Sequence, residues 1–343
     1  MRRVETAVVI LNWNGEALMR RYLPSVVNSL EDENAVVVVA DNGSTDASLR
    51  YVEETFPQVE IVRLERNYGF AKGYNEAFKK LPEVLEADYY VLLNDDVETP
   101  KGWLAPLVGR LRGDLQCGAV MPKVLSARQR EYFEHAGASG GFIDWFGFPY
   151  CRGRLLDTVE RDEGQYDAPM EIHWATGACL AVRRCDYERE GGFEEKFFAH
   201  MEEIDLCWRM RRRGKTIWVE PNSTVYHLGG GTLGYESPRK AYLNHRNSLW
   251  MLRRNLRGGE KVIVLLLRVP MDLLAVATYA MKGNGRAARA ALRAVGEGLF
   301  AKCPKPIAAD YCKASRGCVW LLWHYFIRRH HRFSELNRRG QHA

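Results

Sequence analysis

The stretch that decides the fold is YYVLLNDDVE, residues 89–98. Its first five residues form an unbroken apolar run, the pattern of a strand covered on both faces in a parallel sheet. The run ends at Asn94 and two adjacent carboxylates, Asp95 and Asp96, and carboxylates are rarely buried without a partner. Because α/β proteins bind ligands at the carboxyl ends of parallel strands, these residues predict a site for Mg²⁺ or Mn²⁺ between protein and substrate phosphates. The alternative is a polar turn.

Similar apolar runs precede this stretch, at residues 7–11, 35–40 and 59–64. The apolar residues over 16–30 have helical spacing, and residues 67–75 contain glycines typical of a loop that opens a helix. Strands that alternate with helices predict an α/β fold with a doubly wound, mainly parallel sheet and flanking helices.

The charge of the chain is unevenly distributed. The 343 residues carry a net charge of +6, but the part from Arg239 onward has 21 Lys and Arg against 5 Asp and Glu, a net charge of +16. A basic tail indicates contact with nucleic acid or an anionic membrane, or otherwise a solvated helical face. The eight cysteines form no C-x-x-C pair and no zinc-ligand spacing, and residues 1–11 do not read as a signal peptide. We therefore expect reduced thiols in a cytosolic protein.

Two apolar stretches lie in the tail. Residues 262–281 are mostly apolar but include Arg268, Pro270 and Asp272, which a membrane-spanning helix should not carry at its middle. We expect a helix that lies on a membrane or packs on the rest of the chain. Residues 318–327 are rich in aromatic side chains and run into a basic cluster at 328–332, a pattern that suits an anionic bilayer surface. An oligomer interface with a charged rim is the alternative.

Six motifs resemble, in order and spacing, the signatures of family 2 glycosyltransferases. They are VILNWNG (9–15), DNGSTD (41–46), NYGFA (67–71), LNDD (93–96), FFAHMEEIDLCWR (197–209) and VYHLGGGT (225–232). The similarity covers residues 5–255 and is greatest to bacterial rhamnosyltransferase-like members. It implies a GT-A fold and transfer of a sugar from a nucleoside diphosphate donor with inversion at the anomeric carbon.

The resemblance also implies roles on the donor side. Asp41 matches the residue that accepts hydrogen bonds from the base or ribose, although it can instead be the acid of a helix-capping turn. Asn67 and Gly69 match the loop along the nucleotide, and Gly69 can alternatively serve only as a turn residue with positive φ. Asn12 and Asp95 complete the predicted nucleotide-sugar site.

The metal ligands implied by the resemblance are Asp96 and His227, which would hold Mn²⁺ or Mg²⁺. Asp96 stands at the last position of the family's Asp-x-Asp motif, whereas Asn94 replaces the usual first Asp. His227 precedes Gly229–Gly231, a segment flexible enough to close over a diphosphate; a structural histidine is the alternative. We expect His227 to follow a strand at 217–219 and a turn at Pro221 and Asn222.

The acceptor side is expected at the acidic motif. An inverting transfer needs a general base, and the family's base position, normally Asp, is here Glu203. Glu202 and Asp205 are expected to support it; Asp205 is spaced for a helical salt bridge with Arg209, which favours a structural or acceptor-orienting role. Trp174 and Gly177 match the stretch before the acceptor-side strand. The aromatic residues of 122–175 suit sugar stacking or core packing equally.

These observations predict a GT-A domain over residues 1–255, with a nucleotide-binding half (1–121) and an acceptor-binding half (122–255), followed by a basic, partly apolar helical tail (256–343). Every nucleotide motif precedes the tail, so a chain ended after about Arg257 should remain soluble and still bind donor. We expect a metal-dependent inverting hexosyltransferase of surface polysaccharide biosynthesis, acting on a glycan or lipid-linked glycan acceptor. It would be cytoplasmic and peripheral at the inner face of an anionic bacterial membrane, or form a homo-oligomer through the tail.

Three other functions are weighed against this one. A sugar-nucleotide-binding scaffold without activity is the first, because Asn94 and Glu203 both depart from the usual residues. A sugar nucleotidyltransferase should carry a basic, glycine-rich triphosphate loop, and residues 12–16 contain no Lys or Arg. A nucleic-acid binder would leave the carboxylates of both motifs unexplained, since they repel phosphates, so no nucleic-acid partner is expected.

Overall fold

The computed structural model describes residues 2–135, 137–229, 237–305 and 316–336. At its centre lies β4 (Leu85–Leu93), which contains the apolar run quoted above and begins four residues earlier than that run. Residues 90–93 of β4 are fully buried, as a strand covered on both faces requires.

The main sheet has nine strands in the order β11-β13-β6-β12-β4-β1-β2-β3, with β5 paired to β13. The other strands are β1 Arg2–Asn12, β2 Ala35–Asp41, β3 Glu60–Arg63, β5 Val97–Glu98, β6 Cys117–Ser126, β11 Met170–Ile172, β12 Cys179–Arg183 and β13 Thr216–His227. Strands β3, β2, β1 and β4 are mutually parallel, whereas β12 runs antiparallel between β4 and β6. The predicted mainly parallel α/β sheet is confirmed.

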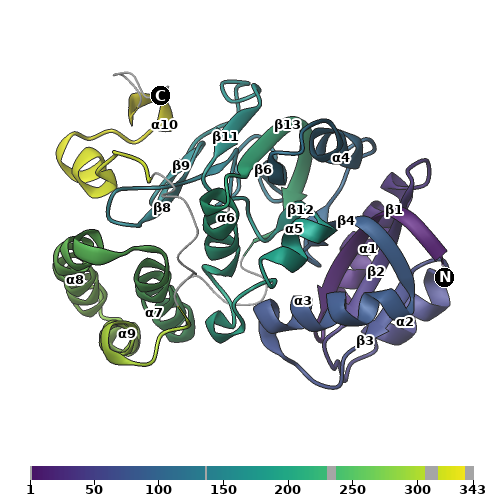
Figure 1. Ribbon diagram of the computed structural model, residues 1–343, viewed down its shortest axis with the longest axis horizontal. Helices are drawn as coiled ribbons and strands as arrows, with labels where there is room; N and C mark the ends of the chain where they lie inside the picture. The colour runs from purple at the N-terminus through teal and green to yellow at the C-terminus, as the bar shows by residue number, and fades with distance from the viewer. Residues whose placement is uncertain (1, 136, 230–236, 306–315, 337–343) are drawn as a thin grey trace.

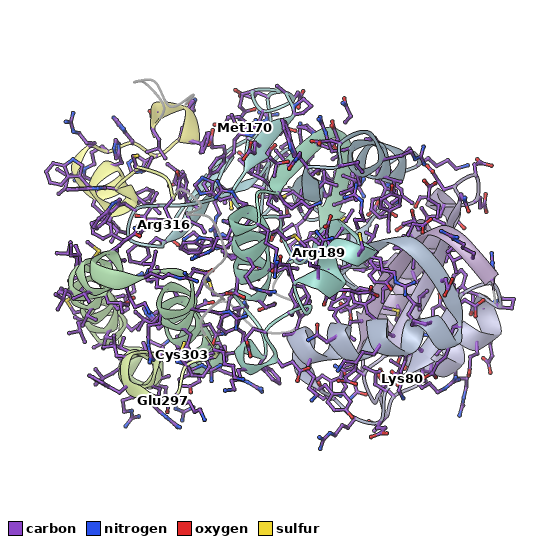
Figure 2. All side chains as sticks on the ribbon, in the orientation of Figure 1. Lys80, Met170, Arg189, Glu297, Cys303 and Arg316 are labelled. Atoms are coloured by element: carbon purple, nitrogen blue, oxygen red, sulfur yellow. The ribbon has the colours of Figure 1, made fainter. Side chains whose placement is uncertain are left out.

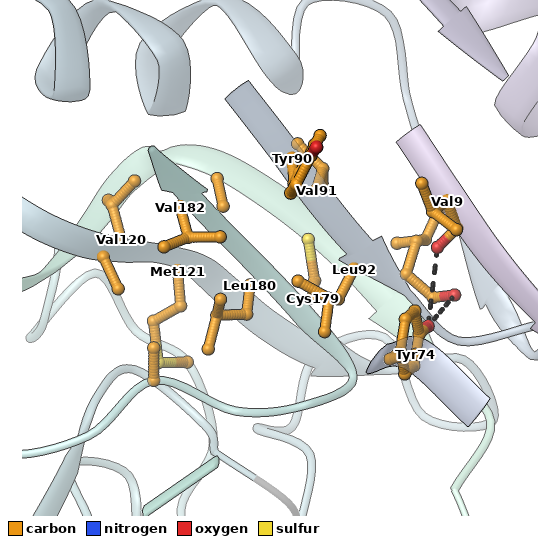
Figure 3. Packing of buried hydrophobic residues seen from close by; sticks show 14 of the residues in the cluster. Val9, Tyr74, Tyr90, Val91, Leu92, Val120, Met121, Cys179, Leu180 and Val182 are labelled. Carbon is orange, nitrogen blue, oxygen red and sulfur yellow. Dashed lines mark hydrogen bonds between the residues drawn. The ribbon is translucent and has the colours of Figure 1, made fainter. Parts of the chain in front are cut away.

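The parallel register brings the predicted donor motifs to one edge. Asn12 at the end of β1 is paired with Asp41 at the end of β2, and Ile10 is paired with Leu93 at the end of β4. Figure 3 shows how α3 is tied to this edge: the Tyr74 hydroxyl donates to the carbonyl of Leu93 at 3.1 Å. Buried apolar side chains of β4, β6 and β12 fill the space beside it.

Helices surround the sheet and form a separate group at one end. The α-helices are α1 Glu16–Ser29, α2 Ser48–Thr55, α3 Gly69–Lys80, α4 Leu104–Gly113, α5 Arg184–Arg189, α6 Glu202–Arg212, α7 Pro238–Asn255, α8 Gly258–Met281, α9 Gly285–Phe300 and α10 Phe333–Leu336. Figure 1 shows α7, α8 and α9 together at the end of the molecule opposite β1–β3. Helix α6 lies between this group and the main sheet.

A second, antiparallel sheet is built by residues between β6 and β11. Its strands are β7 Gly141–Ile143, β8 Pro149–Cys151, β9 Arg154–Leu155 and β10 Thr158–Val159. The ring of Phe142 contacts those of Tyr150 and Phe333, and Phe146 contacts Trp320. These aromatic side chains of residues 122–175 therefore pack with one another and with the tail.

The tail also contacts the second sheet through its backbone. Trp145 N–H donates to the Val319 carbonyl at 3.0 Å, and Gly317 N–H donates to the Ile143 carbonyl at 2.9 Å. Arg316, labelled in Figure 2, is paired with Glu260 at the start of α8 at 2.6 Å. Residues 316–336 are thus part of the packed structure rather than a loose extension.

Two local expectations need correction. The expected turn at Pro221 and Asn222 is wrong, because β13 continues to His227 and absorbs these residues in a register shift between Glu220 and Thr224. Proline lacks an N–H, and a bulge tolerates that loss. The apolar stretch at 318–327 contains only one short helical segment, the π-helix Trp323–Ile327. The stretch at 262–281 does form a helix, α8, whose Arg268 is buried.

Candidate active site

The predicted metal ligands Asp96 and His227 meet between two segments of the main sheet. His227 ends β13 beside Val97 of β5, and its Nε2 lies 2.9 Å from Asp96 Oδ1. The other ring nitrogen, Nδ1, lies 3.2 Å from Glu134 Oε2, a charge contact whose geometry is bent away from a regular hydrogen bond. Both carboxylates are almost fully buried. The imidazole is therefore held between two acids.

These surroundings determine the charge of His227. Burial opposes protonation, but contacts with Asp96 and Glu134 outweigh it and raise the pKa of His227 to about 10. The protonated ring balances the two acids at neutral pH. Asn94, which replaces the usual Asp, has its amide nitrogen 3.5 Å from His227 Nε2.

The donor set at this point fits a divalent ion that also binds substrate phosphates. Asp96 offers a hard oxygen, and His227 offers an imidazole nitrogen once Nε2 has lost the proton that lies between it and Asp96, because a metal binds only the neutral ring. Among the described residues no group of three or more His, Cys, Asp or Glu forms a ready cage. An ion with two protein ligands would therefore depend on the diphosphate for its remaining ligands, as Mg²⁺ often does.

Asp95 faces the opposite side, toward β1. A Cβ at Gly15 would lie 2.8 Å from Asp95 Oδ2 and 2.6 Å from Asn12 Oδ1, so these two oxygens border the same small space. Burial, together with the neighbouring charge of Asp96, raises the pKa of Asp95 to about 7. The buried Asn12 Oδ1 has no hydrogen-bond partner among the described residues. A donor group from a ligand can satisfy it.

Asp41 and Asn12 form one network at the ends of β1 and β2. Asn12 Nδ2 donates to Ser48 Oγ at 2.9 Å and to Ser44 Oγ at 3.1 Å, and lies 3.3 Å from Asp41 Oδ1. The backbone N–H of Ser44 donates to the Asp41 carboxylate at 3.2 Å. Asp41 thus accepts within the turn at Ser44 but does not cap α2, which begins at Ser48 with no side-chain cap, and its nucleotide-binding role stays a prediction.

Asn67 and Gly69 are held by Asn42, a residue to which the sequence assigned no role. Asn42 Nδ2 donates to Asn67 Oδ1 at 3.2 Å and to the Gly69 carbonyl at 3.1 Å, and Asn42 Oδ1 accepts from Tyr68 N–H at 2.9 Å. Gly69 has φ +78°, and a Cβ there would lie 2.5 Å from the Phe198 ring. The turn interpretation of Gly69 is therefore confirmed, and close packing against Phe198 also needs glycine there, while its place along the nucleotide stays a prediction.

The acidic motif begins α6. Glu202 and Glu203 are its first two residues, and each has one carboxylate oxygen, Oε2, that is buried without a hydrogen-bond partner among the described residues. Burial raises the pKa of Glu203 to about 7, and burial together with the charge of Glu203 raises the pKa of Glu202 well above its usual value. A carboxyl group with a pKa near neutrality is suited to general-base catalysis.

The predicted acceptor-side residues divide into two groups. Gly177 lies beside Glu203, the predicted base. A Cβ at Gly177 would be 4.0 Å from Glu203 Cβ and 3.2 Å from the Phe70 ring. Trp174 is buried, and its Nε1 donates to the Phe142 carbonyl at 2.9 Å, so it packs against the second sheet. Gly177 therefore lies at the candidate site, whereas Trp174 packs between the site and the second sheet.

Asp205 is fully buried beneath the start of α6. It accepts from Arg209 Nε at 2.8 Å and from Asn255 Nδ2 at 2.9 Å, and it lies 3.2 Å from Arg254 Nε. The predicted pair with Arg209 is confirmed. These contacts join α6 to the end of α7, which matches the structural role favoured for Asp205.

Glu134 is the residue that sequence reasoning missed most clearly. It lies in YFEH, residues 132–135, a stretch given no role because its aromatic neighbours dominated the interpretation. A lone acid between aromatic residues is itself a signal, since buried carboxylates need a partner. Of the glycines after His227, Gly229 has φ +66°, and Gly230 and Gly231 lie outside the described residues.

Comparison with known proteins agrees with this geometry. The family model described as Glycosyl transferase family 2 matches residues 7–139. An N-acetylglucosaminyl-diphospho-decaprenol L-rhamnosyltransferase of Mycobacterium tuberculosis is 26% identical over 268 residues, which are 74% of this chain and 85% of that protein.

Solved structures share the fold at low sequence identity. TarS 1-349 of S. aureus in complex with UDP-GlcNAc has a TM-score of 0.57 and 17% identity, covering 88% of this chain and 82% of that one. The mannosyltransferase PcManGT of Pyrobaculum calidifontis in complex with GDP-Man and Mn²⁺ has a TM-score of 0.52 and 15% identity, covering 88% and 89%. The predicted GT-A type of fold is confirmed.

Proposed function

We propose that this chain, whose residues 7–139 match the Glycosyl transferase family 2 model, transfers a sugar from a nucleoside diphosphate donor with inversion. One observation carries the proposal: Glu203 presents a buried, unpaired oxygen at the start of α6, with its pKa raised to about 7. Gly177 and Phe70 join this carboxylate to the loop after Asn67 and Gly69. The predicted base and the predicted donor loop therefore border one site.

An inverting transfer is a single displacement, so the acceptor hydroxyl loses its proton to a base opposite the departing diphosphate. Glu203 would take that proton. Asp41 and Asn12 would bind the nucleoside, and Asp95 would lie along the donor sugar. When bound, Mn²⁺ or Mg²⁺ held by Asp96 and His227 would neutralise charge on the leaving diphosphate.

The test is sugar transfer from a panel of nucleotide sugars, with and without Mn²⁺. We expect one donor to be used or slowly hydrolysed by the wild type, and Glu203→Gln to lose that reaction while still binding the donor. Donor binding without turnover in the wild type, under all conditions, would favour the inactive scaffold. Diphosphate release from a nucleoside triphosphate and a sugar phosphate would favour the nucleotidyltransferase.

We further propose that the acceptor is lipid-linked and that α8 holds the protein on the membrane. The name of the Mycobacterium tuberculosis relative includes a decaprenol-linked diphosphate. Helix α8 is long and apolar enough to cross a membrane. Unlike a typical helix of a soluble protein, it buries charged side chains and exposes large apolar ones. Arg268 and Asp272 are buried and paired at 3.1 Å, and Arg268 donates to the Phe146 carbonyl at 3.1 Å.

The outer face of α8 is a continuous apolar stripe. Its large exposed residues are Val262, Ile263, Leu266, Leu267, Leu273, Leu274 and Met281. Leu266 and Leu274 are 68% and 66% exposed, two turns apart on one face. Exposed Trp320, Trp323 and Phe326 add aromatic side chains of the kind found at bilayer interfaces. Because Arg268 and Asp272 bind the rest of the protein, α8 is suited to lie on a bilayer rather than to cross it, and we propose the cytoplasmic face.

Sedimentation with anionic and with neutral vesicles tests the membrane proposal. Leu266→Gln with Leu274→Gln should reduce the bound fraction strongly, whereas Leu115→Gln, also highly exposed but on a loop after α4, should not. The basic tail predicts weaker binding at high salt and to neutral lipid. If the wild type stays in the supernatant at low salt and forms oligomers that the double variant lacks, the stripe is an oligomer interface instead.

A further inference from the structure

The loop that leads into the acidic motif has an unusual backbone. Three of its residues that are not glycine have positive φ: Phe198 at 66°, His200 at 70° and Met201 at 74°. Such conformations are unfavourable for residues with a side chain and persist only where the surrounding structure imposes them. Met201 is the residue directly before α6, so this backbone sets the direction in which α6 and Glu203 begin.

One side chain of α7 binds almost the whole loop. The amide nitrogen of Asn247 lies within hydrogen-bond distance of three loop carbonyls: Phe197 at 2.9 Å, Ala199 at 2.9 Å and His200 at 2.8 Å. An amide group has two protons, so two of these carbonyls are bonded at a time and the third shares a proton. Asn247 is completely buried, and no water competes for these bonds.

The orientation of this amide is itself fixed. Asn247 Oδ1 accepts from Arg246 Nε at 3.0 Å and from Arg246 Nη2 at 2.8 Å. The arginine donates further to the Lys196 carbonyl at 3.2 Å and lies over the Trp250 ring at 4.3 Å. Because Arg246 can only donate, the oxygen of Asn247 must face it and the NH₂ group must face the loop.

The other side of the loop is bonded to the donor motif. The Phe198 carbonyl accepts from the backbone N–H groups of Phe70 at 3.0 Å and Ala71 at 3.1 Å, in the first turn of α3. The Phe198 ring fills the space that a side chain at Gly69 would need. The loop at 197–201 is thus held from α7 by Asn247 and from the donor side by α3.

We infer that Asn247 is a positioning residue that holds the loop at 197–201 in its strained form and thereby sets Glu203 against the bound donor. This inference rests on the proposed function, in which Glu203 is the base. It goes beyond that function because Asn247 touches neither donor nor base, and acts through the backbone it binds. The amide, rather than its size, is the required feature.

Asn247→Asp is the sharpest test, since Asp has the same shape, keeps an acceptor for Arg246 and cannot donate to the loop. We expect kcat to fall by about 10–100-fold, because small misplacement of a catalytic group is costly, with the KM for the donor changed less than threefold. We also expect the acid limb of the kcat–pH profile to move to lower pH, as a released Glu203 becomes better solvated.

Ser248→Ala is the matched control. Ser248 is the next residue of α7, is also buried, and accepts from Arg268 Nη2 at 3.1 Å, so its loss weakens α7 packing without touching the loop. It should leave kcat and its pH profile unchanged. Amide hydrogen exchange over residues 68–75 and 197–203 gives a readout that needs no activity; both segments should exchange faster in Asn247→Asp alone.

The outcomes separate the two claims. If Asn247→Asp keeps wild-type kcat, pH profile and exchange while Glu203→Gln is inactive, the positioning role is refuted and the base assignment stands. If Glu203→Gln is as active as the wild type, the proposed function fails, whatever Asn247→Asp does. A kcat lost equally in Asn247→Asp and Ser248→Ala would show general destabilisation and also refutes the role.

Discussion

Replacing Glu203 by Gln should make the protein more stable and less active. Burial raises the pKa of Glu203 to about 7 from an ordinary value of 4.5. Below pH 4.5 the carboxyl is protonated in both the folded and the unfolded chain, and there is no penalty. Between pH 4.5 and 7 the unfolded chain releases the proton while the folded protein retains it, so the free energy of unfolding falls as pH rises.

The size of the penalty follows from the two pKa values. Each pH unit between them lowers the free energy of unfolding by about 1.4 kcal/mol, so above pH 7 the total reaches about 3 kcal/mol. Partial exposure of Glu203 and its proximity to Glu202 reduce this value, and we expect a measured difference of about 1–3 kcal/mol. Gln carries no charge and escapes the penalty.

Urea unfolding at pH 4.5 and pH 8 measures this difference directly. Glu203→Gln should match the wild type at the lower pH and exceed it by about 1–3 kcal/mol at the higher, while turnover falls by roughly 10²–10⁴-fold with donor affinity retained. Glu54→Gln, an exposed residue of α2, controls for loss of a negative charge. A Glu203→Gln protein that is no more stable than the wild type at pH 8 would contradict the reasoning.

Other substitutions test the remaining assignments. Asp96→Asn should abolish the Mn²⁺-dependent part of donor binding measured by calorimetry, and Asp95→Asn should reduce it less. Equal Mn²⁺ dependence in the wild type and in Asp96→Asn would refute the assignment of Asp96 as a metal ligand. Gly69→Ala should reduce donor affinity and thermal stability together, because its Cβ would lie 2.5 Å from the Phe198 ring; an unchanged melting temperature would argue against that packing. Glu203→Asp should retain more turnover than Glu203→Gln, and Glu202→Gln should retain most of it; a more damaging Glu202→Gln would show that the motif register is wrong. A chain ended after Arg257 should aggregate in size-exclusion chromatography, contrary to the sequence expectation, because Val319 and Phe333 then no longer cover the second sheet.

The sequence predicted best those features that arise from local patterns. The apolar runs predicted β1, β2 and β4, and the polar residues that follow each run predicted the edge where Asn12 and Asp41 meet. The pattern of apolar residues along a strand and the polar residues that end it are local properties, so they can be read from one sequence. The course of β13 past Pro221 was not predicted, because a bulge depends on pairing with β6, which lies about a hundred residues earlier.

Two features of the tail and the site could not be read from the sequence, because each depends on contacts between distant segments. Arg268 and Asp272 argued against a spanning helix, but only the structure places them inward against Phe146 and His245. Likewise, Asn247 is one of many polar residues on a basic helix until α7 is placed beside the loop at 197–201. Burial of a polar side chain is a tertiary property, and its partners lie far away in sequence.

The same reasoning resolves the departure at Asn94. A neutral side chain at the first position of the Asp-x-Asp motif weakens a clamp of two carboxylates, which was the reason to weigh an inactive scaffold. The structure places another carboxylate, Glu134, on the far side of His227, 3.2 Å from Nδ1. An acid at Nδ1 makes the other nitrogen of a metal-bound imidazole a better ligand and fixes the orientation of the ring. In the proposed metal site, Glu134 would thus supply through His227 the negative charge that Asn94 lacks, and the Asn94 substitution would not by itself make the protein inactive.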